Sequence, residues 1–184
     1  MNKQELEPFR FPVGRFDIPE TITEEMIGDY ISVIAHFPTA IAAEVAGLSD
    51  SQLSWRYRPD GWSIRQVVHH CADSHMNAYI RFKLALTEVD PQIKPYEEAL
   101  WAMLPDTIDC AVEASLDILR GLHKRWAVLL VNLGPEEHNR GFFHPGANYT
   151  YRLDQTMALY AWHCKHHLEH IKLAKAEKGR FGVV

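Results

Sequence analysis

Four long stretches of the chain repeat apolar residues every three to four positions, which is the period of an amphipathic helix. Polar residues fill the positions between them, so each stretch predicts a helix with one face toward a core. We expect these helices over residues 21–47, 63–88, 108–133 and 153–178. Four long helices predict an all-α bundle, and we expect residues 1–184 to form a single domain.

The segments between the helices carry turn and strand signals. Prolines interleaved with aromatic residues predict an extended N-terminal arm over residues 1–20. Residues 48–62 contain a Pro-Asp-Gly turn and predict a long loop. Residues 96–104 predict a short helix that Pro105 stops. Aromatic residues on both sides of a Pro-Gly-Ala-Asn turn in residues 142–151 predict a small β-hairpin before the last helix.

The last predicted helix concentrates histidines. His163 and His167 are four residues apart, as are His166 and His170, so each pair lies on one helical face. The first pair lies at the edge of the apolar face, roughly 70–110° from its centre, and the second pair lies roughly 130–170° away, toward solvent. Two imidazoles one turn apart can bind one divalent metal ion. We therefore expect His163 and His167 to be metal ligands, with a metal-free, histidine-rich surface helix as the alternative.

A third ligand is expected on the second predicted helix, among His69, His70 and His75. On the helical wheel His69 lies opposite the apolar stripe, His70 lies on its flank and His75 lies within it. A histidine within the stripe is more often a hydrogen-bonded core residue, but the pattern leaves the choice between His70 and His75 open. Asn77 and Arg81 share the flank of His70 and could orient an anionic substrate; an ordinary salt bridge or capping contact is the alternative.

Charge and cysteine content narrow the possible partners and location. The 184 residues carry a net charge of −5, which gives no basic surface for nucleic acid or for an anionic membrane. No apolar run approaches the roughly 18 residues of a membrane span, and the polar N-terminus leads into no secretory signal. The odd set Cys71, Cys110 and Cys164 indicates reduced thiols in a cytoplasmic protein.

Several motifs have the pattern of a known family. They are GWSIRQVVHHCADSHMN at residues 61–77 with YIRFK at 79–83, FHP at 143–145, and YAWHCKHHLEHI at 160–171. Together they closely resemble the YfiT-type metal-dependent hydrolases of the DinB-like superfamily, which also includes bacillithiol-transferase-like proteins. The resemblance spans roughly residues 10 to 175.

The resemblance implies a four-helix bundle with up-down-down-up topology. It implies three metal ligands, one from the second helix and an H-x3-H pair from the fourth, which are His70, His163 and His167 in this sequence. The sequence departs from the wider family at His170, where many relatives carry glutamine. This difference removes no ligand.

Three imidazoles leave open positions on a divalent ion, which is the arrangement of a catalytic rather than a structural zinc site. We therefore expect one Zn²⁺ per subunit, with Ni²⁺ as the alternative, and metal-dependent hydrolysis of a small-molecule substrate. The first alternative is metal-dependent S-transfer from a low-molecular-weight thiol such as bacillithiol. The second is a non-catalytic metal-binding module.

The general base, the substrate and the roles of His75, His144 and His170 are not determined by the pattern. The loops carry more aromatic residues than one bundle interior needs, and aromatic residues are enriched at protein interfaces. Together with the resemblance to homodimeric relatives, this predicts a two-fold homodimer.

Overall fold

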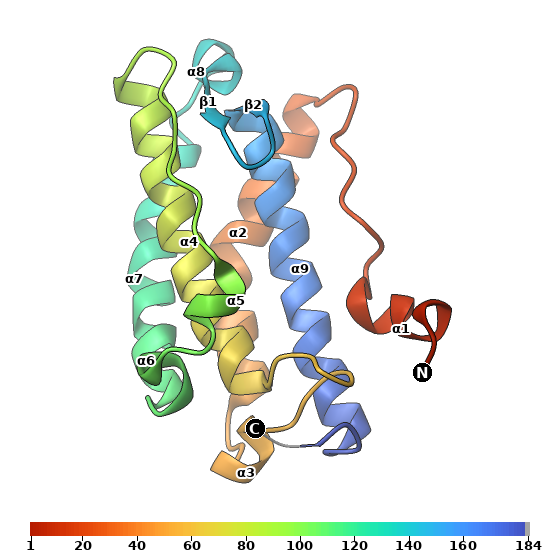
Figure 1. Cartoon of the computed structure of the whole chain (residues 1–184). Coiled ribbons are helices and arrows are strands. Elements are labelled where there is room, and N and C mark those ends of the chain that lie inside the picture. The colour runs from red at the N-terminus through yellow and green to blue at the C-terminus, as the bar shows by residue number, and fades with distance from the viewer. Residues whose placement is uncertain (183–184) are drawn as a thin grey trace.

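The computed structural model describes residues 1–182 and is dominated by four long helices. They are α2 (Glu24–Val45), α4 (Ile64–Thr87), α7 (Val112–Leu130) and α9 (Leu153–Glu177). In the view of Figure 1, α2 runs down, α4 and α7 both run up, and α9 runs down. The predicted four-helix bundle with up-down-down-up order is thus confirmed, up to the arbitrary choice of direction.

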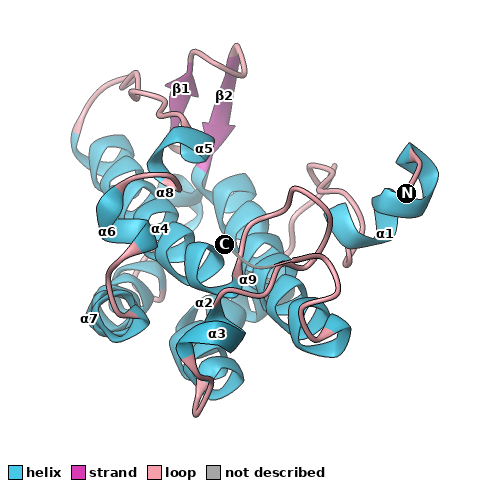
Figure 2. Ribbon diagram, turned by 60° about the horizontal axis from the view of Figure 1, so that its bottom comes forward, coloured by secondary structure: helices cyan, strands magenta, loops and turns pink. Residues whose placement is uncertain are grey.

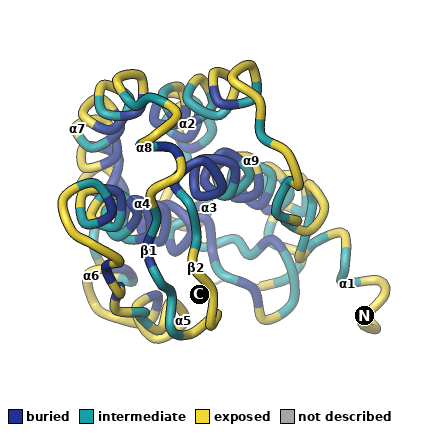
Figure 3. The backbone as a smooth tube through the Cα atoms, turned by 90° about the horizontal axis from the view of Figure 1, so that it is seen from above, coloured by how far each residue is buried: buried dark blue, intermediate teal, exposed yellow. Residues whose placement is uncertain are grey.

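Each long helix packs against two others. α2 lies between α9 and α7, and α4 contacts α7 and α9 from the other side. Phe37, Ile41 and Ile64 belong to a core cluster toward the end where α2 finishes, and Phe82 and Trp126 belong to a second cluster toward the opposite end. Figure 3 shows buried backbone positions turned inward and exposed ones outward on all four helices. These inward faces are the apolar stripes of the sequence.

The helix ends follow local signals. The Thr23 hydroxyl accepts a hydrogen bond from the backbone N–H of Met26 at the start of α2. Ser63 and Gln66 form a capping box at the start of α4. At the end of α9, Lys178 adopts a left-handed conformation with φ of 47°, as C-terminal caps commonly do. The boundaries of α2, α4 and α9 therefore agree with prediction to within a few residues.

The connections contain short helices. These are α3 (Asp50–Leu53), α5 (Glu98–Trp101), α6 (Pro105–Ile108) and α8 (Pro135–Asn139). Pro105 begins α6 instead of only stopping the preceding helix, because proline fits the first turn, where its missing N–H is not needed. The third long helix consequently begins at Val112 and not at 108. The segment between α4 and α7 runs back along the bundle, which allows α4 and α7 to be parallel (Figure 1).

The predicted hairpin is formed by β1 (Gly141–His144) and β2 (Tyr149–Arg152), which pair antiparallel with Gly141 opposite Arg152. It stands at the end of the bundle where α9 begins (Figure 2). A side chain at position 141 would collide with the backbone carbonyl of Tyr151, so glycine is required there. The hairpin thereby brings His144 to the same side of the bundle as the start of α9.

The N-terminal arm is only partly extended. Residues Lys3–Arg10 form helix α1, so the prediction of an extended arm over 1–20 is wrong for this segment. Asn2 and Glu5 form a capping box that satisfies the first backbone N–H groups, and the helix continues through Pro8. Figure 2 shows α1 beside the bundle instead of within it.

Among the described residues, one helix is long and apolar enough by composition to cross a membrane, and it is α2. The prediction that no apolar stretch approaches a membrane span is therefore wrong for α2, by length and composition. The side chains of Ile34, Phe37 and Ile41 are at most 1% exposed and pack inside the bundle. One face of α2 therefore packs in the core of the bundle.

Candidate metal centre

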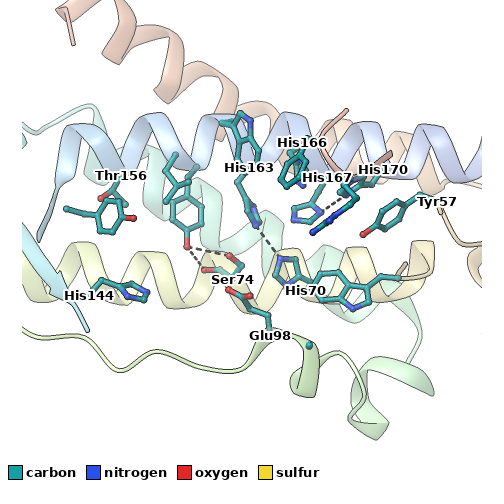
Figure 4. A pocket seen from close by; sticks show the side chains of 18 of the residues that line it. Tyr57, His70, Ser74, Glu98, His144, Thr156, His163, His166, His167 and His170 are labelled. Atoms are coloured by element: carbon teal, nitrogen blue, oxygen red, sulfur yellow. Dashed lines mark hydrogen bonds between the residues drawn. The ribbon is translucent and has the colours of Figure 1, made fainter. Parts of the chain in front are cut away.

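Two helices bring three histidines together. His163 and His167 lie one turn apart on α9, and His70 faces them from α4 (Figure 4). One ring nitrogen from each lies within 4.8 Å of the others. The Nε2 atoms of His70 and His163 are 3.3 Å apart. Two nitrogens that share a tetrahedral zinc at roughly 2.0–2.1 Å lie about 3.4 Å apart, so this donor set fits one such ion.

The environment keeps these imidazoles neutral. Burial, and to a smaller extent the neighbouring His166, lower the pKa of His70 to about 4. Burial likewise holds the pKa values of His163 and His167 well below the ordinary value. A neutral imidazole has one nitrogen with a free lone pair, which is the form that binds a metal ion. The three side chains therefore have the protonation state that metal binding needs.

The structure brings one of the two candidates on α4 into the histidine cluster. His70 is the one that joins His163 and His167, whereas His75 lies behind His163 with no exposed surface. Nε2 of His75 is 3.0 Å from Nδ1 of His163. His75 is thus a hydrogen-bonded core residue, the more common role for a histidine in an apolar stripe. His69 is also buried, and its Nδ1 is 2.7 Å from the Ser115 hydroxyl.

His166 and His170 do not face solvent, and that prediction is wrong. Their exposed fractions are 7% and 2%. The Tyr57 ring stacks on His170 with centroids 3.9 Å apart, and the Phe11 ring lies 6.1 Å from that of His166. A helical wheel shows only the faces of one helix. It could not show that the N-terminal segment and the 48–62 loop cover this face of α9.

The three histidines open onto a cavity of about 610 Å³. Its walls come from α4, α9, the hairpin and the connecting loops (Figure 4). Aromatic rings form much of the lining, which also includes arginines; examples are Tyr57, Trp62, Tyr160, Arg10, Arg58 and Arg81. A concave, largely aromatic cavity with a few convergent polar groups is the usual form of a small-molecule site.

The chain matches the model of the DinB superfamily over residues 36–171. It belongs to the DinB superfamily. A Bacillus mycoides protein named "putative metal-dependent hydrolase" is 48% identical over 166 residues, which cover 90% of this chain and 95% of that protein. A Bacillus cereus protein of the same name is 49% identical over 162 residues, 88% of this chain and 92% of its own.

A solved relative has the same fold. YfiT from Bacillus subtilis, described as a probable metal-dependent hydrolase with an unusual four-helix bundle topology, superposes with a TM-score of 0.90. It is 41% identical, and the match covers 94% of this chain and 98% of that one. The family and the bundle expected from the motifs are therefore confirmed.

The two residues expected to orient substrate in this DinB-superfamily chain separate in the structure. Arg81 lines the cavity. The pKa of His144 on the hairpin is lowered mainly by burial and to a smaller extent by the positive charge of Arg81. The Arg81 charge is therefore felt at the hairpin end of the cavity. Asn77 does not line the cavity, and its side-chain amide donates to the backbone carbonyl of Asp73 one turn earlier.

Sequence reasoning missed other residues of the cavity wall. Glu98 reaches it from α5, and partial burial raises the pKa of its carboxyl group while Arg81 opposes the shift. Ser74 and Tyr160 lie side by side, with their hydroxyl oxygens 3.4 Å apart. Ser74 is on the helix that carries His70, so helical spacing could have found it. Glu98 lies in a connection whose position no local pattern specifies.

Cys71 and Cys164 are fully buried in the core of the bundle. Burial raises the pKa of both thiols far above the ordinary value, so neither ionises readily. All three cysteines are free. Neither core thiol is therefore placed or ionised as a nucleophile would need to be.

Proposed function

We propose that this chain is a metal-dependent hydrolase in which His70, His163 and His167 hold one divalent ion. The observation that carries the proposal is the convergence of three neutral imidazole nitrogens within 4.8 Å at a cavity wall. A divalent ion held by three side chains supplies a Lewis acid that activates water and polarises a carbonyl group. Zinc is the ion we propose, and nickel is the alternative because imidazole binds both.

The cavity residues position the substrate and limit solvent access. The tyrosine and tryptophan rings present apolar surface, while the hydroxyl groups of Ser74 and Tyr160 and the Glu98 carboxyl offer polar contacts. Arg81 lines the cavity and its charge acts on His144 of the hairpin. We propose that it binds an anionic group of a small-molecule substrate.

Replacing Arg81 by methionine, which keeps most of the side-chain volume, is expected to raise KM about 10- to 100-fold for an anionic substrate, because a charge-assisted hydrogen bond contributes ~1.5–3 kcal/mol. The measurement compares two matched aryl esters, one neutral and one carrying a carboxylate. The neutral ester serves as the control and should be hydrolysed with unchanged KM. Equal effects on both esters would show that Arg81 has only a structural role.

The proposed function is tested on untagged protein, since a polyhistidine tag would bind metal itself. Elemental analysis should find about one zinc or nickel ion per chain. A chelator should abolish ester and amide hydrolysis, and the metal alone should restore it. Protein that retains full activity after complete metal removal would refute the proposal.

S-transfer from a low-molecular-weight thiol such as bacillithiol is the second candidate. Two observations favour it over a protein-thiol mechanism. Cys71 and Cys164 are buried in the core and Cys110 does not line the cavity, so a reacting thiol must enter with a cosubstrate, for which the cavity of about 610 Å³ has room. The test incubates the metal-bound protein with an electrophilic substrate, with and without the thiol. Consumption of the substrate only when the thiol is present would support S-transfer, whereas consumption without the thiol would support hydrolysis. A metal-binding module without catalysis would show neither activity with the metal bound.

We also propose a cytoplasmic homodimer. The free cysteines suit a reducing compartment. The loop aromatics mostly pack on their own chain, as Phe16 does near Trp162 with ring centroids 5.9 Å apart. In contrast, Leu100, Met103 and Leu104 are 67%, 60% and 48% exposed in the connection between α4 and α7, where a second copy would cover them.

Light scattering at micromolar concentration is expected to give about twice the chain mass of 21.2 kDa. Aspartate at both Leu100 and Leu104 should shift the protein to the monomer mass, because a buried charge without a partner opposes association. Val128, another exposed apolar residue but on α7, provides the matched control position. A monomer peak for the unmodified protein would contradict the proposed dimer.

A further inference from the structure

Three imidazoles form a hydrogen-bonded chain that ends at His163, and the two behind it, His75 and His123, are buried. The ring atom Nδ1 of His123 on α7 lies 2.6 Å from the backbone carbonyl oxygen of Ile34 on α2. Nε2 of His123 lies 2.7 Å from Nδ1 of His75, and Nε2 of His75 lies 3.0 Å from Nδ1 of His163. His75 and His123 are 0% and 1% exposed. Both rings are therefore shielded from bulk water.

The carbonyl at one end determines the proton position on every ring. A carbonyl oxygen only accepts, so His123 must carry its proton on Nδ1, which leaves Nε2 as an acceptor. His75 must then donate from Nδ1 and accept at Nε2. His163 must therefore donate from Nδ1, which leaves the lone pair on its Nε2. That nitrogen is the one that faces His70, at 3.3 Å.

His167 has a corresponding partner. Its Nδ1 lies 3.3 Å from Nδ1 of His170, which is 2% exposed beneath the Tyr57 ring. If His170 accepts in this contact, His167 carries its proton on Nδ1 and presents the lone pair of Nε2 to the cluster. Both histidines of α9 would then offer Nε2 to the ion, with Nδ1 held by the partner behind each ring.

We propose that His75 and His170 are positioning residues that fix the tautomers of His163 and His167, with His123 and the Ile34 carbonyl fixing that of His75. This inference rests on the proposed metal site, because the fixed tautomers matter only if the Nε2 lone pairs bind an ion. Partners behind metal-ligating imidazoles orient the ring and hold the correct nitrogen deprotonated. Here the partners are imidazoles instead of the more usual carboxylates or carbonyls.

The first test uses metal-free protein with ¹⁵N-labelled histidine. Long-range ¹H–¹⁵N spectra distinguish a ring protonated on Nδ1 from one protonated on Nε2. We expect His75, His123, His163 and His167 to carry the proton on Nδ1, and His170 to carry it on Nε2. A proton on Nε2 of His163 or His167 would overturn the inference without involving the metal.

The second test measures zinc affinity by competition with a chromophoric chelator. His75→Phe and His170→Phe keep a ring but remove the acceptor, and each should weaken binding on the order of 10- to 100-fold. His75→Gln places an oxygen near the Nε2 position, and His170→Asn places one near the Nδ1 position, so these variants should recover most of the affinity. Unchanged affinity in both phenylalanine variants would overturn the proposal.

The matched control is His69→Phe. His69 is 5% exposed on the same helix as His70 and His75, but it bonds to Ser115 and not to the cluster. This variant should lose stability while keeping the zinc affinity and the tautomers of the unmodified protein. If His75→Phe does not fold, the spectra of the metal-free protein and the two His170 variants still decide the question.

The remaining outcomes separate this inference from the proposed function. His166, His167 and His170 also have ring nitrogens within 4.8 Å of one another. Two zinc ions per chain, one of them lost in His170→Asn, would make His170 a ligand and overturn its positioning role. Protein that binds no zinc but shows the expected tautomers would refute the metal site while leaving the hydrogen-bonded arrangement established.

Discussion

Alanine in place of His163 is expected to leave the protein without its metal ion and without metal-dependent activity. The same result is expected for His70→Ala and His167→Ala. Zinc affinity should fall by more than about 100-fold in each, because even groups behind the ligands contribute 10- to 100-fold. Elemental analysis of untagged protein and chelator competition give the two measurements. Circular dichroism should show the helical content unchanged, since the mutated rings face the cavity.

His166→Ala is the matched control for these variants. His166 lies on the same helix, is equally rich in aromatic contacts and stacks on Trp162 with centroids 4.3 Å apart. It does not belong to the group formed by His70, His163 and His167. Its replacement should leave the metal content nearly intact. Loss of metal in His166→Ala with retention in His163→Ala would show that the neighbouring group of His166, His167 and His170 holds the ion.

The metal-free protein is expected to lose stability steeply as the pH falls from 6.5 to 4. Burial lowers the pKa of His123 to about 4 in the folded state, against an ordinary value of 6.5. Between these values the unfolded chain binds a proton that the folded chain does not, so unfolding becomes more favourable as the pH falls. The contribution of His123 to the free energy of unfolding is fully present above pH 6.5. By pH 4 protonation of this one residue in the unfolded chain lowers that free energy by ~3 kcal/mol.

Other buried histidines add to this loss, because burial also lowers the pKa values of His75 and His166. The free energy of unfolding is measured by urea titration in the presence of a chelator, at intervals from pH 7.5 to 4.5. Its slope against pH gives the number of protons taken up on unfolding. We expect an uptake of more than one proton per chain. His123→Gln is the control and should lower the uptake by about one. A flat profile over this range would contradict the burial of neutral imidazoles.

Much of the fold could be predicted from the sequence because it depends on local signals. The apolar period gave four helices, and capping residues such as Thr23 and Ser63 placed their starts. The pairing of His163 with His167 is also local, since a spacing of four residues places two side chains on one helical face wherever the helix lies. Helix α1 was missed because the prolines concealed the capping box of Asn2 and Glu5.

Tertiary structure decided the rest of the site. The periodicity of α4 left His70 and His75 both possible, and the choice depends on how α4 is rotated against α9. Here His70 meets the α9 histidines at the cavity, and His75 meets His163 from behind. Neither contact has a local signature, because each joins residues about 90 positions apart.

The same reason explains the other differences between sequence and structure. His170 is covered by Tyr57 from a loop that the helical wheel of α9 does not include. His123 reaches His75 only because α4 and α7 are parallel neighbours in the bundle. The sequence by itself determined the one-turn spacing of His163 and His167 and limited the third ligand to the histidines of α4. The packing of α4, α7 and α9 determined which imidazoles face one another, and hence which nitrogen of His163 carries the proton.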